Sequence, residues 1–212
     1  MNLRKLQKKV WRVLKRALKI LVLIGAFFTA YYFYYNNQFW THVNTDNFKV
    51  LREYNGRNIK GYRGRQVLVH KDFEKYIQQI DSYANANNLE LVINQSYRLD
   101  KKSLVKTVVK PAKYSNHHAG FAIDFNVKYD GVIYFSDQLK RGNISKLPSD
   151  IQNFIQKIRK DQHLRWGGDF NTEDPIHIDV PINLLDKTLY LECSSDCESD
   201  YLTSKLKWEF WN

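Results

Sequence analysis

The segment FAIDFNV, residues 121–127, alternates strictly between large apolar side chains and small or polar ones. Successive side chains of a strand point to opposite faces, so this alternation predicts a half-buried strand. The core face would carry Phe121, Ile123, Phe125 and Val127. Asp124 would then project from the other face, between Ala122 and Asn126. Asp130-Gly131 is typical of a hairpin turn, so the run at 132–135 is expected to pair antiparallel with this strand.

A second alternating segment, PIHID at 175–179, predicts another short strand with His177 on its non-core face. Asp174 directly precedes it, and His117 lies seven residues before Asp124. Two imidazoles and one carboxylate suit a catalytic zinc site, which has three protein ligands and leaves a fourth position for water. The sequence therefore predicts Zn²⁺ bound by His117, Asp124 and His177. Asp174 is the predicted general base that takes a proton from the attacking water.

Other segments favour a mixture of helices and strands. Apolar residues at a spacing of three to four predict helices over 71–88 and 149–160. Short strands are expected at 66–70, 89–94 and 163–166. The predicted fold class is therefore α+β, with a small, mainly antiparallel sheet and flanking helices.

The N-terminal segment differs from the rest of the chain. Its first 19 residues contain eight cations and no acid, and residues 20–35, ILVLIGAFFTAYYFYY, carry no charge. As a helix, this run would be about 24 Å long, slightly short of the ~30 Å hydrocarbon core, with tyrosines and Trp40 as an interfacial belt. We predict one uncleaved transmembrane helix over 20–40, with the N-terminus in the cytoplasm. A cleaved signal peptide is the alternative, but small residues at both −3 and −1 are not evident.

The charge distribution argues against a nucleic-acid partner. The formal net charge is +11, of which residues 1–19 supply +8, so the remaining residues carry 11 − 8 = +3. A nucleic-acid binder usually spreads a basic surface over its folded domain.

The first ligand segment also carries a family resemblance. SNHHAGFAID fits the pattern S-x-H-x-x-G-x-A-x-D at Ser115, His117, Gly120, Ala122 and Asp124. This pattern resembles the signature of the zinc peptidases that include VanY-type D-alanyl-D-alanine carboxypeptidases and L-alanyl-D-glutamate endopeptidases, among them phage endolysins. In that family the third ligand lies on a downstream strand, with an acidic base three residues earlier, and His177 and Asp174 match these positions.

Two further segments resemble this family. Gln95-Ser96-Tyr97-Arg98 is similar to an S-G-Y-R-like segment, which implies that Arg98 binds substrate or stabilises the oxyanion, with Tyr97 and Ser115 as further substrate contacts. WGGDF at 166–170 is similar to the endolysin branch. The carboxypeptidase branch usually has a Glu-x-Trp-His run, whereas Ile176 stands at the Trp position here. The resemblance covers roughly residues 70–185.

The resemblance and the N-terminal segment together predict a membrane-anchored zinc endopeptidase that cleaves peptidoglycan stem peptides, first of all at the L-alanyl–D-glutamate bond. It would lie on the periplasmic, cell-wall side of a bacterial inner membrane and remodel the wall locally, for example beside an envelope machine such as a secretion system. One alternative is a D,D-carboxypeptidase that trims terminal D-Ala. Another is a non-catalytic wall-binding scaffold.

The predicted organisation begins with a basic cytoplasmic segment (1–19), a transmembrane signal anchor (20–40) and a linker or peripheral region (41–70). A zinc peptidase domain (71–185) and a C-terminal extension (186–212) follow. Cys193 and Cys197 are expected to form a small-loop disulfide, and the alternative is two free surface thiols. The aromatic tail, 205–212, packs on the domain, meets the membrane or binds a partner.

Overall fold

A computed structural model describes residues 3–99 and 114–209 of the chain. It contains two compact units, residues 1–38 and 39–212, and each is described by itself.

The first unit is a single long helix, α1 (Leu3–Asn36). Its side chains from Ile20 to Tyr35, nearly all apolar, are exposed. Among the residues that the structure describes, no helix combines the length and the apolarity needed to cross a bilayer. The transmembrane anchor expected over 20–40 is therefore not confirmed.

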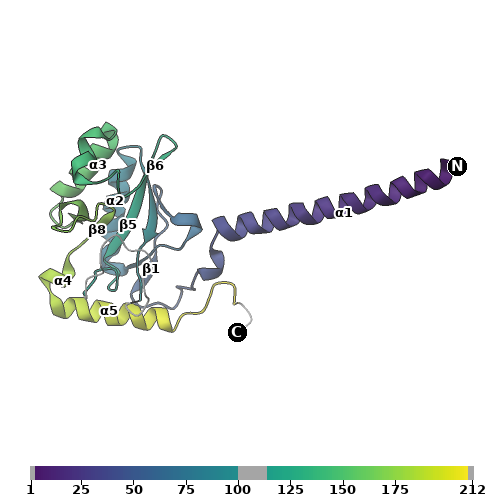
Figure 1. Ribbon diagram of the computed structural model, residues 1–212. Coiled ribbons are helices and arrows are strands. Elements are labelled where there is room, and N and C mark those ends of the chain that lie inside the picture. Colours follow the sequence, from purple (N-terminus) through teal and green to yellow (C-terminus); the bar gives the residue numbers. More distant parts are fainter. Residues whose placement is uncertain (1–2, 100–113, 210–212) are drawn as a thin grey trace. The chain divides into compact units, whose positions relative to one another are not determined.

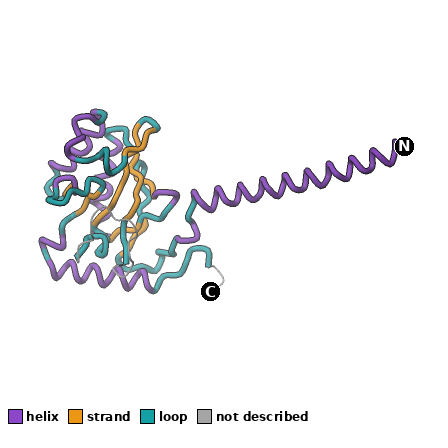
Figure 2. Tube along the Cα trace, viewed as in Figure 1, coloured by secondary structure: helices purple, strands orange, loops and turns teal. Residues whose placement is uncertain are grey.

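The second unit is built on a six-stranded sheet (Figures 1 and 2). Neighbouring strands follow the order β2, β4, β5, β8, β7, and β6 also pairs with β5. Only the β2–β4 pair is parallel, and the other pairs in this sheet are antiparallel. The expected α+β class with a mainly antiparallel sheet is confirmed. The strands are β2 (Ile59–Gly61), β4 (Glu90–Gln95), β5 (Ala122–Tyr129), β6 (Val132–Tyr134), β7 (Arg165–Trp166) and β8 (His177–Asp179).

Strand β5 follows the predicted alternation and occupies the centre of the sheet. Its core-facing side chains Ile123, Phe125 and Val127 are at most 1% exposed. The predicted hairpin is also confirmed, because β6 pairs antiparallel with β5 across Asp130 (φ 48°) and Gly131 (φ 76°). Two consecutive positive φ angles are what a two-residue type I′ hairpin loop requires.

Two helices, α2 (Glu74–Asn85) and α3 (Ser149–Lys160), lie together against the sheet and supply much of the core (Figure 1). The predicted helix at 71–88 is shorter at both ends. Residues Lys71–Phe73 form a 3-10 turn, η3, and Asn88 has a left-handed backbone conformation, with φ 52°. The buried stripes of the two helices are Ile77, Ile80 and Ala84, and Ile151, Phe154, Ile155 and Ile158.

A two-stranded sheet and the helix α5 bring the beginning and the end of the second unit together. Strands β1 (Leu51–Glu53) and β3 (Leu68–His70) pair antiparallel, and the C-terminal helix α5 (Lys187–Leu202) packs beside β1. The Asp200 carboxylate on α5 accepts hydrogen bonds from three successive backbone N–H groups, at 2.8–2.9 Å, immediately before and at the start of β1. The remaining short elements are α4 (Ile182–Leu185), η1 (Phe39–Thr41), η2 (Tyr62–Gly64), η4 (Arg141–Lys146) and η5 (Gly167–Asp169).

The segments on either side of the predicted peptidase domain, 41–70 and 186–212, therefore both contribute to the second unit. Cys193 and Cys197 lie one turn apart on α5, and both are free and buried, so they neither form the small-loop disulfide nor lie on the surface as the alternative expected. The described part of the tail packs on the domain, because the Trp208 indole donates to the Trp40 carbonyl at 3.0 Å and Lys207 N donates to the His42 carbonyl at 2.8 Å.

Candidate metal centre

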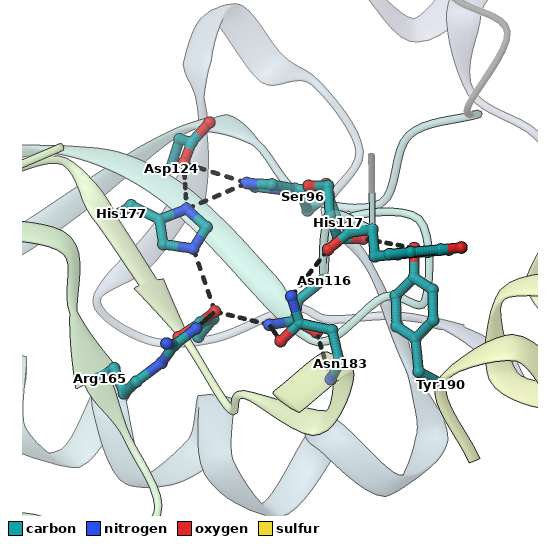
Figure 3. Close-up of polar contacts among 11 residues, drawn as sticks. Ser96, Asn116, His117, Asp124, Arg165, His177, Asn183 and Tyr190 are labelled. Atoms are coloured by element: carbon teal, nitrogen blue, oxygen red, sulfur yellow. Dashed lines mark hydrogen bonds and ion pairs between the residues drawn. The ribbon is translucent and has the colours of Figure 1, made fainter. Parts of the chain in front are cut away.

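Three side chains predicted as metal ligands converge at one end of the sheet (Figure 3). Asp124 Oδ1 lies 3.1 Å from His117 Nε2 and 2.9 Å from His177 Nδ1, and the two imidazole nitrogens are 3.2 Å apart. Among the residues that the structure describes, these three form the cluster whose geometry could hold a metal ion. Their convergence is the central geometric requirement of the predicted site.

Strand pairing brings two of these side chains together. Asp124 on β5 and His177 on β8 are directly opposite each other in the antiparallel register. Opposite residues on neighbouring strands turn their side chains to the same face of the sheet. The alternation of both strands therefore positions a carboxylate and an imidazole side by side on the face away from the core.

The loop before β5 supplies the third side chain. His117 is buried, and its carbonyl accepts hydrogen bonds from the backbone N–H groups of Gly120 (3.2 Å) and Arg98 (3.3 Å). Gly120 has a φ of +74°, and a Cβ there would lie 2.6 Å from His70 N. Only glycine adopts this conformation without strain and leaves room for β3, which explains the glycine in the S-x-H-x-x-G pattern.

Each histidine has a partner on its other nitrogen. His117 Nδ1 lies 2.8 Å from the Ser96 carbonyl oxygen, and His177 Nε2 lies 3.4 Å from Asp179 Oδ2. A carbonyl or carboxylate oxygen can only accept, so these partners assign the proton to His117 Nδ1 and to His177 Nε2. In the neutral imidazoles, which are the forms that bind a metal, the lone pairs of His117 Nε2 and His177 Nδ1 are then directed at the cluster.

This donor set fits a zinc ion. Bonds of about 2.0–2.2 Å at tetrahedral angles separate neighbouring donor atoms by about 3.4 Å. The observed separations of 2.9–3.2 Å require only a small outward movement to match. Two nitrogen lone pairs that face each other and a carboxylate oxygen are stabilised by a shared cation.

The electrostatics of the cluster favour positive charge. Burial alone lowers the pKa of His177, but hydrogen bonds to Asp124 and Asp179 and the charges of these carboxylates raise it to about 10. Burial raises the pKa of Asp124, yet the neighbouring imidazoles outweigh this effect and hold it below its usual range. The arrangement thus keeps an ionised carboxylate in a half-buried position, where a cation is attracted more strongly than at a fully exposed one.

The predicted base, Asp174, lies in the loop that leads into β8. Its pKa is raised, first by burial and then by the negative charge of Asp124, with opposing effects of His177 and His117. The charges of all three side chains of the cluster therefore act on the Asp174 carboxylate. A raised pKa is what a carboxylate needs to accept a proton efficiently near neutral pH.

Trp166 and Gly167, the first two residues of the WGGDF segment, fix the position of this loop. Asp174 N donates to the Gly167 carbonyl at 2.9 Å, and the Trp166 indole donates to the Pro175 carbonyl at 2.8 Å. A Cβ on Gly167 would lie 2.3 Å from the Asp174 carbonyl oxygen and 2.9 Å from His177 Cβ. The glycine therefore permits the close approach of the loop that carries both the predicted base and the predicted third ligand.

A family model described as D-alanyl-D-alanine carboxypeptidase matches residues 109–180. The matched segment is about a third of the chain and contains His117, Asp124, His177 and Asp174. No curated protein matches the chain. The match and the His117–Asp124–His177 cluster point independently to a hydrolase of the zinc peptidase type.

The remaining predicted site residues have different surroundings. Arg98 is 8% exposed, and its role toward substrate stays a prediction. Tyr97 packs in the smaller apolar cluster, with its ring 5.5 Å from that of Tyr201, and its contact with substrate stays a prediction. Ser115 contributes its carbonyl, which accepts from His118 N at 2.9 Å and from the Tyr190 hydroxyl at 3.2 Å. It thus anchors the ligand loop to α5 through its backbone.

Sequence reasoning missed a second carboxylate beside the cluster, that of Asp179. It lies two residues after His177 on β8, so the alternation of this strand turns both side chains to the same face. That spacing was the available signal. The pairing of β7 with β8, which brings Arg165 opposite Asp179, has no local signature in the sequence.

Proposed function

We propose that this protein is a zinc-dependent peptidase that cleaves peptide bonds in peptidoglycan. The convergence of His117 Nε2, Asp124 Oδ1 and His177 Nδ1 carries the proposal, because these three donors offer the ligand set of a catalytic zinc site. The match to a carboxypeptidase family supports the substrate class.

The mechanism assigns each protein group a separate task. Bound zinc would polarise the scissile carbonyl and make a water molecule acidic enough to attack near neutral pH. Asp174 accepts the proton of that water and returns it to the leaving amine. Arg98 binds a substrate carboxylate or stabilises the developing oxyanion. The Ser96 carbonyl and Asp179 hold the two imidazoles in the tautomers that present their lone pairs to the metal.

The favoured bond is internal to the stem peptide, at L-alanyl–D-glutamate. This choice rests on the glycine pair of WGGDF and on Ile176, which stands where the carboxypeptidase branch usually has Trp. The second candidate is a D,D-carboxypeptidase that removes terminal D-Ala, and the printed description of the matching family favours it.

A single digestion distinguishes these activities. Purified full-length protein is incubated with peptidoglycan, with chelator, and with chelator followed by excess zinc, and the released muropeptides are analysed by mass spectrometry. An endopeptidase cuts within the stem, whereas a carboxypeptidase releases only single D-Ala residues. Asp174→Asn should abolish either activity. Sedimentation with wall sacculi without any released fragment would instead support a wall-binding scaffold.

We further propose that α1 holds the enzyme at the bacterial inner membrane, with the second unit on the cell-wall side. Two features support this proposal: the exposed, uncharged segment 20–35 and the cluster of cations before it. Tethered hydrolysis would suit local wall opening beside an assembling envelope machine. Fractionation tests the attachment: the full chain should remain with membranes after alkaline extraction, and replacement of Leu21, Leu23, Phe27 and Phe28 by Ser should release it.

A further inference from the structure

We propose that Asp179, paired with Arg165, is the positioning residue that holds His177 with Nδ1 toward the metal and also orders the loop of His117. The inference rests on the proposed function, since it concerns how the same site binds its metal. It assigns to these two residues a role in metal affinity as well as a role in folding.

The first step concerns the contacts of Asp179. Asp179 is only 2% exposed. Its Oδ2 lies 2.6 Å from Arg165 Nη2, 2.6 Å from Asn116 Nδ2 and 3.4 Å from His177 Nε2, while Oδ1 accepts from Arg165 Nε at 3.0 Å. A buried carboxylate is costly without such donors, so the four contacts fix one orientation of the group.

The second step concerns the tautomer of His177. Because the ionised carboxylate only accepts, it selects the form of His177 with a proton on Nε2 and a free lone pair on Nδ1. Asp179 holds the ring at Nε2, and Asp124 Oδ1 lies 2.9 Å from Nδ1, where the two atoms would share the metal. Partners of this kind orient metal-binding histidines and raise their basicity, and their loss typically weakens metal binding 10–100-fold.

The third step concerns Arg165. It stands directly opposite Asp179 in the β7–β8 pair, so the register itself forms the fork-shaped ion pair. The guanidinium also lies 4.8 Å from the ring centre of Phe170, and that ring lies 5.8 Å from the ring of His177. Arg165 thereby neutralises Asp179 and fixes its carboxylate beside His177.

The fourth step links the two histidine ligands. Asn116 immediately precedes His117, and besides its bond to Asp179 it accepts from Asn183 N at 3.2 Å and donates to Asn183 Oδ1 at 3.0 Å (Figure 3). One carboxylate therefore contacts His177 directly and the neighbour of His117 through a side-chain amide. Loss of Asp179 should disturb both ligands at once.

The test measures metal binding rather than catalysis. Asp179→Asn keeps the shape of the side chain but replaces one acceptor oxygen by a donor, which cannot serve both Arg165 and His177. Zinc affinity is measured by competition with a chromophoric chelator, and the cobalt-substituted protein is examined by visible absorption. We expect zinc affinity about 10–100-fold weaker and an altered cobalt spectrum.

The matched control is Asp169→Asn. Asp169 forms the same fork with Arg159, at 2.8 and 2.6 Å, but has no contact with the three ligands in the interactions described above. Its zinc affinity should equal that of the parent. If Asp179→Asn does not fold, the double variant Arg165→Gln/Asp179→Asn leaves no unpaired buried charge and should show the same loss of affinity.

The outcomes separate the two proposals. A parent protein that binds zinc stoichiometrically, together with a folded Asp179→Asn variant of equal affinity and unchanged cobalt spectrum, overturns the positioning role and leaves the proposed function intact. A parent that binds no zinc overturns both. A selective loss of affinity in the Asp179 variants supports the inference.

Discussion

Asp124 on β5 and His177 on β8 are 53 residues apart in the chain, yet they stand directly opposite each other, with Asp124 Oδ1 2.9 Å from His177 Nδ1. A shift of one residue in this register would turn one of the two side chains to the core face. The pairing of two short strands therefore defines the site as much as the ligands themselves do.

Replacement of Asp124 by Asn should remove the charge that attracts the metal while preserving the shape of the site. We expect zinc affinity to fall more than about 100-fold, beyond the usual effect of an outer partner. Ligand binding at a hundredfold excess over Kd stabilises a fold by about 2.7 kcal/mol, so zinc should raise the melting temperature of the parent and not that of the variant. Asp150→Asn, which alters the partner of the Tyr129 hydroxyl, is the control. An equal zinc-induced shift in Asp124→Asn would contradict the assignment.

Gly167→Ala should reduce catalysis by displacing the loop of Asp174. The added methyl would lie 2.3 Å from the Asp174 carbonyl oxygen, so the loop must move. A displacement of about 1 Å in an active site can lower the rate about 100-fold, and we expect kcat to fall on this scale. Gly142→Ala is the matched control, because no atom outside its chain neighbours lies within 4 Å of the added carbon. Equal muropeptide release by both variants would show that Gly167 does not set the position of the base.

Asp200→Asn should destabilise the fold by about 2–3 kcal/mol, the usual contribution of hydrogen bonds to a charged group. Burial raises the pKa of Asp200, but the backbone N–H groups of Leu51, Lys49 and Val50 outweigh it and hold the pKa below its usual range. A depressed folded-state pKa gives stability that is present above the unfolded pKa, about 3.9, and is lost as pH falls through the folded value.

Urea unfolding measured between neutral pH and pH 3 checks this prediction. The difference in unfolding free energy between the parent and Asp200→Asn should be largest near neutral pH and should shrink in acid. The exposed Asp196 lies on the same helix, so Asp196→Asn reports any general effect of charge on α5. A difference that stays constant with pH would exclude the ionised carboxylate as its source.

The two thiols should be unreactive in the native protein. Burial raises the pKa of Cys193 to about 11 and raises that of Cys197 further above its ordinary value. Since the thiolate is the reactive form, a thiol reagent should label neither residue at pH 8 until denaturant is added. Fast labelling of the folded protein would contradict the packing of α5.

The sequence predicts the centre of the domain well for a physical reason. Alternation at 121–127 and the turn residues Asp130-Gly131 are local signals, and β5 and its hairpin follow them. The convergence of His117, Asp124 and His177 required the family resemblance in addition, because no local pattern states which strands are neighbours.

The features that the sequence did not predict depend on contacts between distant residues. Helix α5, KTLYLECSSDCESDYL, has scattered apolar residues rather than a clear stripe, and it was predicted as part of an extension. Its role follows from Asp200, whose carboxylate accepts hydrogen bonds from the backbone of Lys49, Val50 and Leu51. These residues lie about 150 positions earlier in the chain. The Asp179–Arg165 pair likewise depends on the β7–β8 register.

Helix α5 supplies Tyr190, Cys193 and Cys197 to the interior and Asp200 to the start of β1. During synthesis on the ribosome, these groups emerge after all three predicted metal ligands and the predicted base. A prematurely terminated chain that ends before α5 would carry all three metal ligands and the base, but it would lack the side chains that close the core around them. The proposed wall-degrading activity would therefore arise only after α5 has been synthesised and has packed against the domain.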